Sequence, residues 1–101
     1  MIFLYTSAKN IEEAKRTAEV LVERKTAGSV SIFPVQTFSH APTGIKETPE
    51  VGIWVKTIDK NVQEVEDIVR AIHSEKIPCV ATFMLWRMNR EYKEWLITST
   101  S

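Results

Sequence analysis

Several features that mark exported proteins and nucleotide-binding enzymes are scarce in this 101-residue chain. Its one cysteine, Cys79, has no partner within the chain, so an internal disulfide is excluded. Its three glycines, Gly28, Gly44 and Gly52, are scattered, which excludes a glycine-rich phosphate loop or a dinucleotide fingerprint. The sequence therefore belongs neither to the disulfide-rich secreted class nor to the common nucleotide-binding classes.

The chain also lacks net charge and long hydrophobic runs. Thirteen basic and thirteen acidic side chains are interspersed, so no charged surface for nucleic acid or an acidic membrane is predicted. The apolar runs at residues 2–5 and 78–86 are far shorter than the roughly 20 residues that span a bilayer, and no signal-peptide pattern opens the chain. We therefore expect a cytoplasmic protein with neither nucleic-acid nor membrane partners.

The length of 101 residues predicts one domain, residues 1–101, and apolar periodicity predicts that it is built from strands and amphipathic helices. Asn10 followed by Glu13 resembles a capping box at the start of the first helix. The expected elements are a central strand at 1–5 that is buried on both faces, a helix from 11 that ends before Gly28, a hairpin of 29–38 and 45–57 around a turn at 40–44, a helix at 59–73, a strand at 79–86 and a short helix after Asn89.

This order is βαββαβ with an extra C-terminal helix, which is typical of the ferredoxin-like α+β fold. In that fold an antiparallel sheet carries two helices on one face, and right-handed crossovers place the first and third strands in its centre. Near Pro34 the apolar pattern of the hairpin slips, which indicates a bulge or an edge position.

The two edge strands predict self-association. A ten-residue strand spans about 33 Å, so the long hairpin overhangs its own core, and its Phe33, Val35 and Phe38 are expected to pack on another subunit. The last strand is apolar on both faces although it lies at an edge, which favours a homo-oligomer. The alternative is that the terminal helix covers its second face.

Only a few residues are candidates for catalysis or metal binding. The acidic side chains lie on exposed helix faces, so no catalytic carboxylate pair is identified, and Cys79 with His73 lacks a third orienting residue. We therefore expect no enzyme. The residues whose side chains suit soft or borderline metal ions are His40, His73, Cys79, Met84 and Met88. As a lone cysteine at the start of a strand, Cys79 is also expected to be a small buried hydrophobe.

Four segments, in order, resemble the CutA divalent-cation tolerance family. They are YTSAKNIEEA at residues 5–14, AGSVSIFP at 27–34, EVGIWVKT at 50–57 and WLITST at 95–100. In the family these correspond to Thr-x-x-Asn-Glu-Glu-x-Ala, Ala-Ala-Cys-Val-Asn-Ile-x-Pro, Glu-Val-x-Leu-x-x-Lys-Thr and Trp-x-x-x-Ser-Thr.

A fifth segment, HSEKIPCV at residues 73–80, is similar to the family's His-Pro-Tyr-Glu-Val-Pro-Glu-Ile. It keeps His73 and Pro78 but has Cys79 where the family has glutamate. Ser29 also stands at the position of a family cysteine. The chain thus resembles a divergent member.

The resemblance implies a homotrimer with clefts between subunits, implicated in tolerance of copper and other divalent cations and acting as a binding module. It makes Lys56, Thr57 and His73 the cleft candidates, and copper or another divalent cation the expected weakly bound ligand. For metal the candidates are His73, Cys79 and His40, with His73 favoured over a His73 and Cys79 pair. Two alternatives are a PII-like regulatory protein that holds a small anion at Lys56, and a scaffold for a protein partner.

Overall fold

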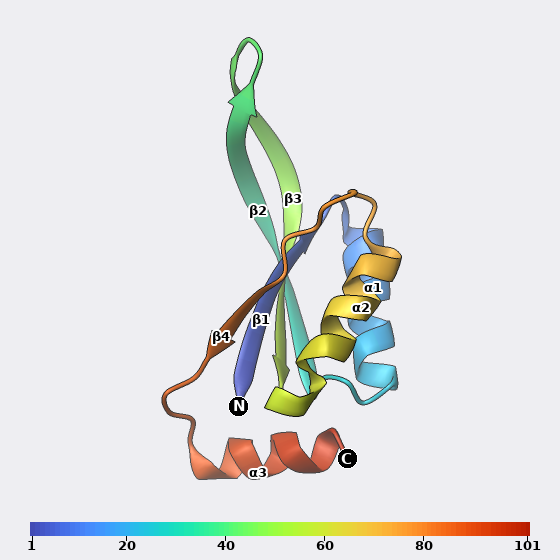
Figure 1. The fold of residues 1–101 in the computed structure, drawn as a ribbon, viewed down its shortest axis with the longest axis vertical. Coiled ribbons are helices and arrows are strands. Elements are labelled where there is room, and N and C mark those ends of the chain that lie inside the picture. Colours follow the sequence, from blue (N-terminus) through green and yellow to red (C-terminus); the bar gives the residue numbers. More distant parts are fainter.

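The computed structural model describes residues 1–101 as a four-stranded sheet with two helices on one face and a third helix at one end (Figure 1). The elements are β1 (Ile2–Ala8), α1 (Ile11–Glu23), β2 (Ser29–Ala41), β3 (Gly44–Thr57), the 3₁₀ helix η1 (Asp59–Asn61), α2 (Val62–Ile72), β4 (Ala81–Met84) and α3 (Arg90–Ser99).

The strand order is β2-β3-β1-β4, and every neighbouring pair is antiparallel. The predicted ferredoxin-like α+β fold is therefore confirmed, with the first and third strands in the centre. No helix is long and apolar enough to cross a membrane.

The core lies between the sheet and the helix pair α1 and α2 (Figure 1). β1 alternates strictly, with Ile2 and Leu4 turned towards the helices and buried, while Phe3 and Tyr5 on the other face are half-buried. The prediction that this strand is buried on both faces is therefore wrong for the single chain. Only the helix-facing side of the sheet is covered, because both helices pack on that side.

The hairpin is longer than predicted, since β2 continues to Ala41 and only two residues separate it from β3. It extends well beyond the helices in Figure 1, and the molecule measures 49 × 26 × 20 Å, so the predicted overhang is confirmed. Pairing runs without interruption through Pro34 and Val51. The bulge prediction is wrong and the edge prediction is right, because β2 forms an edge where proline's missing N–H is tolerated.

β4 covers four residues rather than the predicted residues 79–86. Its partners on β1 run from Tyr5 back to Ile2, so the ladder ends where β1 begins. Helix α3 lies across the lower end of the sheet and packs on β3 (Figure 1). Phe83, which pairs with Phe3 on the face away from α1 and α2, stays 47% exposed, so the alternative that α3 covers the second face of the last strand is wrong.

Candidate functional site

A cavity of about 360 Å³ lies between the hairpin stem and the loop that follows α2. We call it the His73–Cys79 cavity. Both residues line it, so the imidazole and the thiol lie at one cavity, although the sequence favoured His73 alone over a His73 and Cys79 pair. Its other lining residues include two carboxylates and one ammonium group, which are Glu50, Glu75 and Lys46.

His73 is positioned by the end of α2. It is the C-cap residue, its backbone N–H donates to Val69 O at 2.8 Å, and its backbone then turns extended. Its ring Nδ1 accepts a hydrogen bond from the backbone N–H of Glu75 at 3.0 Å. Since an accepting Nδ1 carries no proton, this geometry assigns the N–H of the neutral ring to Nε2.

Glu13 anchors the loop that carries His73 and Cys79. Its carboxylate accepts from the backbone N–H of Ser74 at 2.9 Å and from that of Lys9 at 3.1 Å. Burial raises the pKa of Glu13, but these hydrogen bonds and the electrostatic influence of nearby His73 lower it more, so its pKa lies below the usual 4.5. The start of α1 therefore fixes the end of α2 beside the cavity.

Cys79 is exposed, so the prediction of a small buried hydrophobe is wrong. The chain turns towards the cavity after Pro78 before β4 begins, which leaves the thiol at the surface rather than in the core. No three or more His, Cys, Asp or Glu side chains are gathered closely enough to hold a metal ion. The cavity thus offers donor groups without a preformed coordination sphere.

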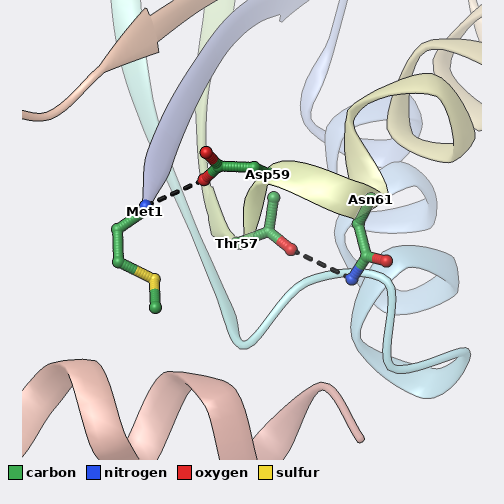
Figure 2. A network of polar contacts seen from close by, with 4 residues as sticks. All are labelled: Met1, Thr57, Asp59 and Asn61. Carbon is green, nitrogen blue, oxygen red and sulfur yellow. Dashed lines mark hydrogen bonds and ion pairs between the residues drawn. The ribbon is translucent and has the colours of Figure 1, made fainter.

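Thr57, another cleft candidate, lies at the opposite end of α2 from His73. It ends β3 and is fully buried, and its hydroxyl donates to Thr26 O. Asn61 Nδ2 donates to the Thr57 hydroxyl at 3.3 Å (Figure 2). With an eleven-residue helix between them, roughly 16 Å long, Thr57 and His73 do not meet within one chain.

Lys56 lies beside Thr57 but on the open face of the sheet. Its Nζ lies 5.8 Å from the ring centroids of both Phe3 and Tyr92, within cation–π range. A single chain therefore gathers Lys56 with aromatic rings, not with His73.

His40 lies near the hairpin tip, opposite Ile45 in the register. It lines a shallow depression of about 220 Å³ with Phe38 and Ile45, and Ser39 borders both this depression and the His73–Cys79 cavity. Of the three predicted metal candidates, the structure thus gathers His73 and Cys79 and leaves His40 apart.

Two carboxylates of the cavity, Glu50 and Glu75, were not among the predicted site residues. Glu75 lies two residues after His73, and this short spacing in the sequence could have identified it as a residue of the site. Glu50 comes from β3, and its approach to the loop after α2 depends on how the hairpin stem is placed, which no local pattern in the sequence reveals.

Comparison with known proteins agrees with this fold. The family model of the CutA1 divalent ion tolerance protein matches residues 2–99. Divalent-cation tolerance protein CutA of Archaeoglobus fulgidus is 36% identical over 94 residues, covering 93% of this chain and 92% of that protein. CutA of Thermus thermophilus is 33% identical over 91 residues, covering 88% of each.

A solved structure from Archaeoglobus fulgidus, described as a periplasmic divalent cation tolerance protein CutA, has the same fold. Its TM-score is 0.94 at 34% identity, and the match covers 100% of both chains. With nearly the whole chain matched by the family model and by these relatives, the chain belongs to the CutA1 divalent ion tolerance family.

Proposed function

We propose that this protein acts in divalent-cation tolerance and binds the cation directly in the His73–Cys79 cavity. Relatives that match over most of their length carry the name divalent-cation tolerance protein. The observation that carries the direct-binding proposal is the convergence of an imidazole, an exposed thiol and two carboxylates on one cavity. These groups are the usual protein ligands of zinc and copper ions.

The geometry around His73 predicts weak binding. A metal ion at Nε2 needs the ring proton on Nδ1, but Nδ1 accepts from the backbone N–H of Glu75. That hydrogen bond has to break when the metal binds, and the scattered carboxylates have to move closer. Both changes reduce the net affinity.

The proposed role is binding rather than catalysis, because the cavity presents no nucleophile with an oriented base and its donors suit a cation. The PII-like alternative gains no support. Its anchoring cation, Lys56, already faces the rings of Phe3 and Tyr92, and no glycine-rich loop surrounds it.

We also propose that the protein is a homotrimer, as the family resemblance implies. The support is physical: β2 and β4 are open edges, and Phe38, Phe83 and Met84 on these strands are exposed. Apolar edge strands of this kind pair with other chains unless they are covered. The family resemblance implies a cleft between subunits lined by Lys56, Thr57 and His73, which a single chain does not bring together.

A cytoplasmic location is proposed from the exposed free thiol of Cys79, which stays reduced in that compartment. One structurally similar protein is described as periplasmic. Cell fractionation of the native host distinguishes the two compartments: recovery in the periplasmic fraction contradicts the proposal.

Calorimetric titration with Zn²⁺ and Cu²⁺ tests direct binding, with Zn²⁺ first because it is redox-inactive towards the thiol. We expect His73→Ala and Cys79→Ser each to weaken binding about tenfold or more, the loss of roughly one ligand. His40→Ala is the matched control, since this histidine lies outside the cavity, and it should leave binding unchanged.

The direct-binding proposal is wrong if the unaltered protein binds neither ion more tightly than about 100 μM. It is equally wrong if His73→Ala and His40→Ala behave alike, because then the histidine in the cavity has no special role.

A further inference from the structure

A second cavity, of about 310 Å³, lies between the segment after β4 and the start of α3. We call it the basic cavity, because Arg87, Arg90 and Lys93 line it and no acidic residue does. The protein as a whole has no net charge. The local excess of three positive charges therefore comes from how the fold places these side chains.

These cations are largely free of carboxylate partners. Arg87 and Lys93 have no carboxylate oxygen within 4.0 Å, and Arg90 Nε lies 3.8 Å from Glu94 in an exposed pair. Such exposed pairs are weak and exchange readily. Met1 also lines the cavity, but its ammonium group is paired with Asp59 at 2.8 Å (Figure 2). Three side chains, not the chain terminus, supply the available charge.

Guanidinium and ammonium groups that converge on a concave surface suit a phosphate-type oxyanion. Arginine presents paired N–H donors that match phosphate oxygens, and lysine adds a compact charge. The positive end of α3 adds little to this preference, because the carboxylate of Glu91 in its first turn already lies there and accepts from Asn89 Nδ2 at 3.2 Å. The three side-chain cations therefore supply the positive charge that faces the cavity.

Trp86 forms part of the same wall and is 93% exposed. An indole beside arginines provides a flat apolar surface at which an aromatic group attached to the anion can stack. We propose that the basic cavity binds a small phosphate-type oxyanion through Arg87, Arg90 and Lys93, independently of the cation site. Free phosphate and a ring-bearing phosphate share this chemistry.

The test is titration with inorganic phosphate at low ionic strength, followed by the NMR signal of the Trp86 indole N–H. Trp86→Phe identifies that signal among the three tryptophans. We expect a saturable shift that the triple variant Arg87→Gln, Arg90→Gln, Lys93→Gln weakens by about tenfold or more, because charged hydrogen bonds are lost. All three side chains are exposed, so the fold should persist, and Arg87→Gln alone serves as a milder variant.

The matched control removes the same charge elsewhere, with the variant Lys9→Gln, Lys15→Gln, Lys25→Gln, whose side chains are also exposed. It should change phosphate affinity less than about twofold, the small effect of general charge at a distance. Equal weakening by both triple variants overturns the proposal, as does the absence of a saturable shift up to about 10 mM phosphate.

A parallel titration with phenyl phosphate distinguishes the source of the anion. Tighter binding than inorganic phosphate, lost in Trp86→Ala, supports a ring-bearing ligand, and equal affinity supports phosphate alone. Binding of phenyl phosphate that the basic-cavity variant leaves unchanged contradicts the site.

Discussion

Glu13 connects two parts of the chain that are 61 residues apart, because its carboxylate accepts from the backbone N–H of Ser74. The sequence predicted the local interaction at the start of α1: Asn10 caps the helix, and its side-chain oxygen accepts from the Glu13 N–H at 2.9 Å. The carboxylate, however, bonds Lys9 rather than closing the capping box on Asn10. The bond to Ser74 depends on how α1 and α2 pack, which sequence spacing does not determine.

This connection predicts a pH effect on stability. Because the pKa of Glu13 is lowered in the folded protein, its contribution is present above the usual value of 4.5 and is lost as the pH falls through the folded pKa. Glu13→Gln should therefore lower the midpoint of thermal unfolding at pH 7 and flatten its decline below pH 4.5. Glu12→Gln, the matched change on the exposed side of the first turn, should do neither.

Thermal unfolding followed by circular dichroism between about pH 3 and 7 measures this effect. An unfolding midpoint that declines as steeply in Glu13→Gln as in the unaltered protein would show that the carboxylate does not anchor the loop.

Among the elements, α3 depends on close approach to the turn before β2. A Cβ atom at Gly28 would lie 2.3 Å from Leu96 Cδ1 and 2.8 Å from Ser99 Oγ. Leu96 is fully buried and has no room to move. The sequence predicted a short helix after Asn89, but not where it would dock, because that depends on the shape of the sheet end.

Gly28→Ala should therefore destabilise the protein by about 1–3 kcal/mol, the usual cost of overpacking. Gly52→Ala is the informative comparison, since its Cβ would meet the outer edge of the Phe33 ring, which is half-buried and can turn away. We expect a smaller loss there. Urea denaturation gives both values, and equal losses would contradict the close docking of α3.

The boundaries of β4 show what apolar composition cannot reveal. Residues 79–86 have the composition of one continuous strand, yet the ladder covers only Ala81–Met84. At one end Cys79 lines the cavity outside the ladder. At the other end the ladder reaches Ile2, where β1 begins, and only one further backbone hydrogen bond follows, from Leu85 N–H to Met1 O at 3.3 Å. The exposed thiol that makes Cys79 a candidate ligand is a consequence of this short strand.

At the scale of the whole molecule, the strand order, the central strands and the overhanging hairpin all followed from the sequence, because short apolar runs and right-handed crossovers constrain them strongly. The cavity did not, because it forms where the hairpin stem meets the loop after α2. His73 and Cys79 were identified from their chemistry, whereas Glu50 joins them only through the tertiary fold.

If the protein is a homotrimer, sedimentation equilibrium at micromolar concentration should give a mass three times that of the chain. Met84→Glu places a charge on an exposed apolar edge and should shift the protein towards monomer. Ile97→Glu adds the same charge on α3, away from the strand edges, and should leave the mass unchanged. A monomeric unaltered protein, or equal effects of the two variants, would contradict the proposed trimer.

The most direct test of the cation site is a crystal structure of the protein soaked in Zn²⁺, with the ion located by its anomalous scattering. We expect one ion in the His73–Cys79 cavity, about 2.0–2.1 Å from an imidazole nitrogen of His73 and about 2.3 Å from the Cys79 sulfur. The Glu75 N–H to Nδ1 hydrogen bond should then be broken. An empty cavity, or zinc bound only elsewhere, would contradict direct cation binding at this site.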